Sequence, residues 1–281
     1  MIYETKKQIA SHLSKYVEQV GSQNKASKLL KDVSVATISN ILNHKWDSIA
    51  DEMWRNLAKQ TGFNSDGWTG AETRNWMFLT KLFSDARLYA NVYGVCAEAG
   101  SGKSYTAKAY SQHDNVYLVR CNEYFNRKTF LAELLQGMGK DSGGYTIAEL
   151  MDTIITQILR AENPLIILDE ADKLSDQVLS FFITLYNKLE DKCGIVMMAT
   201  DHLEKRIERG LRLNKKGYKE IYSRLGRKFI HLPKIQKKDV AQIIRANGLS
   251  EEILITEIFN ESDGDLRRVK RLVHSRKLQE V

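Results

Sequence analysis

The stretch from Cys96 to Ser104, Cys-Ala-Glu-Ala-Gly-Ser-Gly-Lys-Ser, constrains the fold of this chain more than any other. An apolar, β-prone segment (88–96) precedes it, and a segment able to form a helix (105–110) follows it. A strand, a glycine-containing loop and a helix start are the setting of a phosphate-binding loop, whose N–H groups face the anion. We therefore expect a nucleotide site here rather than a glycine-rich turn with a chance Lys-Ser pair.

The residues of this loop have separate expected roles. Lys103 supplies a mobile positive charge to the β- and γ-phosphates, and the Ser104 hydroxyl is an expected Mg²⁺ ligand. The other residues expected to line the phosphates are Ala97, Ala99, Gly100, Ser101, Gly102 and Tyr105. Ala97 replaces the first glycine of the usual pattern, so the entry of the loop departs from it.

Composition limits the class of protein. The chain has 281 residues, enough for a small and a large domain, and its 43% hydrophobic and 27% charged content is typical of soluble globular proteins. The longest apolar runs are too short for a membrane span, and no signal peptide is expected. Cys96, Cys121 and Cys193 are far apart, which favours reduced, buried thiols in a cytoplasm over disulfides or a metal site. A formal charge of +7 favours an anionic partner, with nucleic acid the first candidate.

Residues 1–60 have the spacing of short helices. Apolar positions recur every three or four residues in the first of them, and Ser34 is a candidate N-cap of a later one. A helix, a tight turn and a second helix resemble the helix-turn-helix of phage repressors, so we expect an all-α DNA-binding domain rather than a small helical packing domain. The polar residues expected to face DNA are Thr37, Asn40, Asn43 and Lys45.

After a glycine-rich linker (61–71), segments typical of strands and helices alternate over residues 72–234. The expected strands are Ala90–Cys96, Val116–Cys121, Leu165–Leu168, Gly194–Ala199 and Lys228–Leu232. Helical segments separate them, so the sequence predicts an α/β fold, a parallel sheet with helices on both faces. Residues 235–281 have helical spacing only and are expected to form a small lid.

A second motif, Leu165-Ile-Ile-Leu-Asp169-Glu170, is an apolar strand that ends in two acids. Alone this motif is a modest signal, but about 65 residues after a phosphate loop with Lys-Ser it becomes a strong one. Asp169 is then expected to hold Mg²⁺, usually through a water, and Glu170 to orient the water that attacks the phosphate. The two motifs together predict ATP and Mg²⁺ as ligands and an ATP hydrolase activity.

With both motifs in place, residues 72–281 resemble the AAA+ ATPases. The resemblance implies that Asn122 touches the catalytic acid and that Thr200 reaches the γ-phosphate or the water. It also implies that Arg267, in the lid, reaches back to the phosphate.

The same resemblance implies an arginine finger that reaches the nucleotide of a neighbouring subunit. Arg224 fits this role best and Arg227 is second, both in a segment before the last strand. For Arg224, Arg227 and Arg267 alike, the alternative is a solvated basic face.

The order of the parts is similar to that of transposition ATPases of the MuB type, with TnsC and IstB as relatives. Members bind ATP, polymerise on duplex DNA as helical filaments and deliver target DNA to a transposase, which stimulates hydrolysis. The resemblance thus implies double-stranded DNA, a transposase and further copies of the chain as partners, and no membrane. A helicase loader or replication initiator, and a transcriptional regulator that uses ATP as a switch, are the alternative functions.

Two basic sets compete as the DNA contact of the ATPase region. Arg127, Lys128 and Lys140 follow the second expected strand. The other set, which includes Lys205, Arg206 and Arg209, lies in residues 203–230. This segment contains ten Lys and Arg residues and three Glu residues. Either set suits sequence-independent phosphate contact, and the second suits a solvated helix face or a subunit interface equally well.

Overall fold

The computed structural model describes residues 3–61, 63 and 68–279, which fall into two compact units, Met1–Thr69 and Gly70–Val281. Residues 62 and 64–67 of the expected linker lie outside the described residues. No helix in the described part is both long and apolar enough to cross a membrane.

The described part of the first unit is helical. Its helices are α1 (Tyr3–Val20), α2 (Gln23–Leu29), α3 (Val35–Leu42) and α4 (Asp51–Thr61). The Ser34 hydroxyl accepts the N–H of Thr37 at 3.0 Å and so caps α3, as its position before an apolar run predicts. A core that includes Leu13, Ile38 and Trp54 joins the helices.

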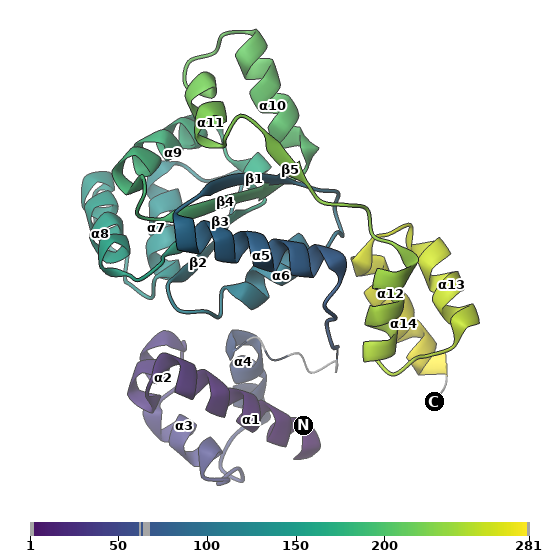
Figure 1. Ribbon diagram of the computed structural model, residues 1–281. Helices are drawn as coiled ribbons and strands as arrows, with labels where there is room; N and C mark the ends of the chain where they lie inside the picture. The colour runs from purple at the N-terminus through teal and green to yellow at the C-terminus, as the bar shows by residue number, and fades with distance from the viewer. Residues whose placement is uncertain (1–2, 62, 64–67, 280–281) are drawn as a thin grey trace. The chain divides into compact units, whose positions relative to one another are not determined.

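The second unit is built on a five-stranded parallel sheet with the order β2-β3-β4-β1-β5 (Figure 1). The strands are β1 (Val92–Cys96), β2 (Val116–Arg120), β3 (Leu165–Asp169), β4 (Gly194–Ala199) and β5 (Phe229–His231). The predicted α/β fold is confirmed, and the strand ends differ from the expected ones by at most two residues. The cysteines are free and buried, as predicted.

Helices cover both faces of this sheet. One face packs on α5 (Arg74–Tyr89) and α6 (Lys103–Tyr110), and the other packs on α7 (Arg127–Gly137), α8 (Ile147–Arg160) and α9 (Asp176–Leu189) (Figure 1). In β3, Leu165 and Ile167 belong to the first core, and Ile166 and Leu168 belong to the second. Both faces are apolar, which explains why this strand is an unbroken aliphatic run.

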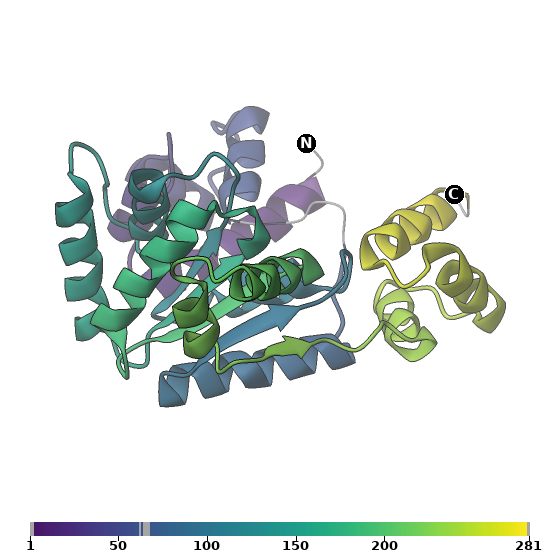
Figure 2. The same cartoon turned by 90° about the horizontal axis from the view of Figure 1, so that it is seen from above.

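Two helical groups complete the unit. After β4 come α10 (Asp201–Arg212) and α11 (Tyr218–Arg224), whose apolar residues join the core of α7, α8 and α9. After β5 an extended segment leads to α12 (Lys237–Ala246), α13 (Glu252–Ser262) and α14 (Leu266–Gln279) (Figure 2). These three helices pack on one another and form the lid.

Candidate active site

The main parts of the candidate site lie at one edge of the sheet because all strands are parallel. The phosphate loop follows β1, Asp169 ends β3 and Thr200 follows β4. β4 pairs in parallel with both β1 and β3, and Cys96 is opposite Ala199 in the register. The carboxyl ends of the strands thus bring together motifs that are far apart in the sequence.

The phosphate loop has a backbone that depends on glycine. Gly100 and Gly102 have φ of +78° and +92°, a left-handed conformation that residues with a side chain rarely adopt. At Gly100 a Cβ would also lie 2.1 Å from the Asp265 carboxylate. Ala97, by contrast, continues the sheet, since its N–H donates to the carbonyl of Ala199 at 3.2 Å. An alanine fits at this position because its φ is not positive.

Lys103 is folded into its own loop. Its Nζ donates to the carbonyl oxygens of Ala97 at 2.6 Å and Glu98 at 3.0 Å, and the residue is 8% exposed. Burial lowers the pKa of Lys103, and the carboxylates of Asp169 and Asp172 oppose that shift. Phosphate oxygens would be stronger partners for this ammonium than neutral carbonyls, because both groups are charged.

Asp169 is 3% exposed at the end of β3, and burial raises its pKa. The Ser104 hydroxyl bonds to this carboxylate and opposes the shift. A carboxylate beside a hydroxyl is an oxygen-donor pair that fits Mg²⁺, whose other ligands are typically waters and phosphate oxygens. Among the described residues no group of three or more His, Cys, Asp or Glu could hold a metal by itself, so the pair suits an ion that arrives with a nucleotide.

Glu170 is held by two cations. Its Oε1 lies 2.9 Å from the Arg120 guanidinium, and its Oε2 lies 2.5 Å from Lys173 Nζ. The bond to Arg120 holds the pKa of Glu170 below its ordinary value, and the bond to Lys173 acts in the same direction against burial. Sequence analysis missed both cations. The available signals were the i, i+3 spacing of Lys173 and the place of Arg120 at the end of β2, opposite Asp169.

Asn122 does not contact Glu170 in this structure. Its Nδ2 donates to the Tyr124 hydroxyl at 3.2 Å, and Arg120 occupies the position beside the glutamate. The residue that contacts Glu170 from this part of the chain is thus Arg120, two positions earlier, and the role implied for Asn122 stays a prediction.

Thr200 begins α10 and contacts a carboxylate that sequence analysis missed. Its Oγ1 donates to Asp172 at 3.0 Å. Asp172 lies in the short 3₁₀ helix η1 (Ala171–Lys173), directly after the acidic end of β3. Thr200 and Asp172 thus join the ends of β3 and β4 beside the phosphate loop.

The lid contacts the phosphate loop at the start of α14. The N–H of Leu266 donates to the carbonyl of Gly100 at 3.0 Å. The next residue, Arg267, is exposed, and its charge adds to burial, the main cause, in lowering the pKa of Lys103. The predicted phosphate contact of the lid thus lies near the loop.

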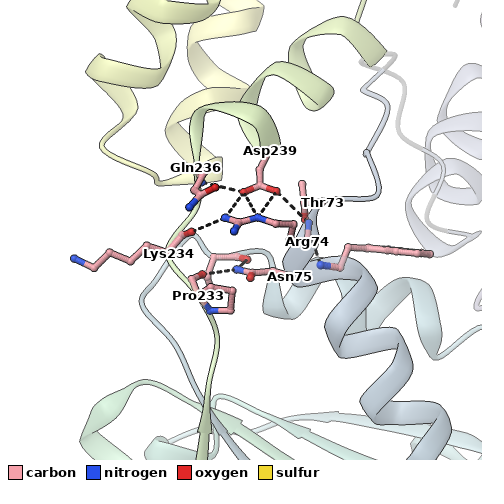
Figure 3. A network of polar contacts seen from close by, with 9 residues as sticks. Thr73, Arg74, Asn75, Pro233, Lys234, Gln236 and Asp239 are labelled. Carbon is pink, nitrogen blue, oxygen red and sulfur yellow. Dashed lines mark hydrogen bonds and ion pairs between the residues drawn. The ribbon is translucent and has the colours of Figure 1, made fainter.

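A second contact between the lid and the sheet is a polar network at the start of α5 (Figure 3). Asp239 in α12 is 1% exposed and accepts from Arg74 Nη2 at 2.9 Å and from the Arg74 N–H at 3.1 Å. The Gln236 N–H donates to the same carboxylate at 2.9 Å. Asn75, also buried, donates to the carbonyl of Ser101 in the phosphate loop at 3.2 Å. The network, which sequence analysis missed, joins α5, the phosphate loop and the lid.

The two arginine-finger candidates differ in their surroundings. Arg224 packs on its own chain: its guanidinium lies 5.2 Å from the ring centroid of Tyr186 and donates to Asn187 at 3.1 Å. Arg227 is exposed, with a φ of +58°. Arg227 is therefore the more exposed of the two, and the identity of the finger stays a prediction.

The first basic set does not form one cluster. Arg127 and Lys128 are exposed in the first turn of α7, whereas Lys140 is exposed beyond its end. The 11 residues of α7 separate the two positions by about 16 Å at the rise of an α-helix.

The second basic set is partly engaged within the chain. Lys205 forms an ion pair with Asp201. Arg206 lies 2.5 Å from Asp176, and its Nη1 donates to the carbonyl of Leu174 at 2.6 Å. Arg209 is exposed. Arg206 therefore ties α10 to the start of α9, which leaves less of its charge for a DNA phosphate.

In the first unit, the residues expected to face DNA lie in α3 and just beyond it. Thr37 and Asn40 are half-buried, whereas Asn43 and Lys45 are exposed. The hydroxyl of Thr37 lies 2.9 Å from that of Ser34, so Thr37 takes part in the helix cap.

Comparisons with known proteins found one family model that matches part of this chain. Residues 87–207 match the family described as AAA domain. Similar solved structures include a DNA replication initiation factor (16% identity, 72% of this chain and 60% of that chain, TM-score 0.47). They also include Drosophila ORC bound to DNA (15%, 69% and 50%, TM-score 0.41) and NtrX from Brucella abortus (12%, 87% and 58%, TM-score 0.48).

The chain spans 50 to 60% of the length of these structures. No curated protein matches it. The family match covers β1 to β4 and the greater part of α10, and so includes the phosphate loop and the acidic end of β3. In sequence, residues 87–207 are therefore similar to an AAA domain.

Proposed function

We propose that this chain is an ATP hydrolase that uses Mg²⁺. The observation that carries the proposal is the hydrogen-bonded pair of the buried Asp169 and the half-buried Ser104 beside Lys103, which is held in the phosphate loop. Lys103 Nζ would exchange the carbonyls of its loop for the β- and γ-phosphates, and Ser104 and Asp169 would hold the ion. Bound Mg²⁺ supplies charge neutralisation at the phosphates.

Glu170 is the residue proposed to orient the attacking water. Its ion pairs with Arg120 and Lys173 favour its ionised form, and each carboxylate oxygen keeps a lone pair that can accept from a water. Thr200 and Arg267 are proposed to contact the γ-phosphate. Asn122 is proposed to lie near the site without a direct contact to Glu170.

The test is calorimetric titration of the full chain with ATP, with Mg²⁺ or with EDTA. The wild type should bind ATP more tightly with Mg²⁺. An Asp169→Asn variant should lose that difference, because a neutral amide holds a divalent ion less well than a carboxylate. Equal affinities with and without Mg²⁺ in the wild type would contradict the metal site.

Self-association is the second part of the proposal. An arginine finger acts on the nucleotide of a neighbour, so hydrolysis should need contact between copies. Arg227 is the better candidate because it is exposed, whereas Arg224 is packed on Tyr186. Mixing an Arg227→Ala variant with a Lys103→Ala variant should restore part of the turnover, since the first has an intact loop and the second an intact finger. An Arg224→Ala variant in the same mixture is the control.

The third part is DNA binding and the biological role. The first unit, with α2 and α3 as a helix-turn-helix, is proposed to bind duplex DNA, with Asn43 and Lys45 as exposed contacts. We propose that copies assemble along DNA with ATP and present it to a transposase. Electron microscopy with ATP and duplex DNA tests this: helical filaments should form with ATP and not with ADP. Isolated copies under both conditions would contradict assembly.

A further inference from the structure

Helix α14 of the lid carries positive charge without any compensating acid. Residues 266–279 contain six Lys and Arg residues, one His and no Asp or Glu. The rest of the lid has the opposite balance, because residues 237–265 contain three Lys and Arg residues and seven Asp and Glu residues. The acids of the lid thus lie mainly in α13 and the segments beside it, whereas α14 has cations only.

The cations of α14 are not all used within the lid. Arg276 pairs with Glu257 of α13 at 3.2 Å. Arg268 and Arg271 are exposed, and among the described residues no hydrogen bond or ion pair engages their side chains. His274 is exposed one turn further along the same helix. Val269 and Val273, between these positions, are buried against the other lid helices.

This arrangement is unfavourable for an isolated helix. Cations in the first turn, such as Arg267 and Arg268, oppose the helix dipole, whose N-terminal end is positive. Like charges three or four positions apart, such as Arg268 and Arg271, also repel each other. A polyanion bound along the helix would offset both effects, because its charges would pair with these cations.

We propose that the exposed face of α14, formed by Arg268, Arg271 and His274, is a docking surface for the phosphate backbone of duplex DNA. Cations repeated along one helix suit a ligand with regularly repeated phosphates. A membrane surface fits less well, since Leu278 is the exposed large apolar side chain of the helix and a membrane-bound helix needs an apolar face. An acidic protein fits less well, since the core of a protein interface is apolar.

This inference rests on the proposed function, because it adds a second DNA contact to that of the first unit. A DNA contact on α14 would also lie on a helix that is hydrogen-bonded to the phosphate loop. The N–H of Leu266, at the start of α14, bonds to the carbonyl of Gly100 in the phosphate loop.

The test is the salt dependence of duplex binding by the full chain, followed by fluorescence anisotropy. The variant combines Arg268→Gln and Arg271→Gln, and its matched control combines Lys237→Gln and Lys238→Gln, which are exposed in α12 of the same lid. Loss of two phosphate contacts should lower the slope of log affinity against log salt by about 1.8. Between about 50 and about 200 mM salt, the wild type should then lose about 12-fold more affinity than the variant. The control should keep the slope of the wild type.

A second variant, with Arg268→Lys and Arg271→Lys, separates charge from folding and should keep the slope. An unchanged slope in the glutamine variant, with normal binding by the wild type, would overturn the α14 surface and leave the proposed function intact. No duplex binding by the wild type would overturn both. If the glutamine variant lost affinity for polyglutamate and kept its affinity for the duplex, the partner would be an acidic protein and the proposal would be wrong.

Discussion

The phosphate-loop edge of the sheet and the lid junction are both buried polar sites, and they are built differently. At the loop edge, Lys103 donates to carbonyls five and six residues earlier in the chain. At the junction, Arg74 and Asp239 are 165 residues apart. The loop edge consists of local sequence motifs that the parallel sheet brings together. The junction, by contrast, forms only when α5 packs against the lid. The first should therefore control chemistry, and the second the position of the lid.

The Glu170→Gln substitution should have the largest effect, and this effect should be confined to ATP turnover at the loop edge. Without a carboxylate to orient the water, turnover of ATP should fall by about 10² to 10⁴-fold, as for other general bases. ATP affinity should change little, because Lys103 and Asp169 are unaltered. Phosphate release measured beside calorimetric binding checks this, with the exposed Glu123→Gln as control. Turnover at the wild-type rate would remove Glu170 from the mechanism.

Lys103→Ala should abolish most ATP binding. The lost charge-assisted bonds should weaken affinity by at least about 100-fold, or about 2.7 kcal/mol. Lys108→Ala is the matched control, since Lys108 is exposed on the same helix. Near-normal affinity in the Lys103→Ala variant would contradict the site.

Arg74→Ala should affect the lid more than the chemistry. It leaves the buried Asp239 without its cation, which should cost about 2 kcal/mol because Arg74 is only partly buried. Hydrogen exchange in α12 should then be about 30-fold faster, with ATP affinity changed less than in the Lys103→Ala variant. Lys81→Ala, an exposed position on α5, is the control. Unchanged exchange in α12 would mean that the junction does not hold the lid.

The smallest expected effect is a pH dependence at the same junction. Burial raises the pKa of Asp239, but the bonds from Arg74 and from the N–H groups of Gln236 and Arg74 outweigh it, so the net pKa lies below its ordinary value. Its stabilisation is thus fully present above about pH 4 and is lost as pH falls through the folded pKa. Denaturant unfolding of the wild type and an Asp239→Asn variant should converge in acid. A constant difference between them down to pH 2 would contradict this account.

Prediction from sequence succeeded where residues close in the chain determine the structure. The strands, the caps and the glycines of the phosphate loop follow from local patterns, and Ala97 fits because it continues β1. The partners of Glu170 did not follow, because Arg120 reaches it only through the register of β2 and β3. The packing of Arg224 on Tyr186 likewise depends on how α11 meets α9. Tertiary contacts, rather than motifs, decide which charges are free to act.

The central claim is that one chain couples ATP hydrolysis at the Lys103 and Asp169 edge to duplex DNA. The most direct measurement is the rate of phosphate release from Mg-ATP by the full chain as duplex DNA is added. The account predicts a rate that rises and saturates with DNA and that disappears in the Lys103→Ala variant. The same rate with and without DNA, or a rate that survives in that variant, would contradict it.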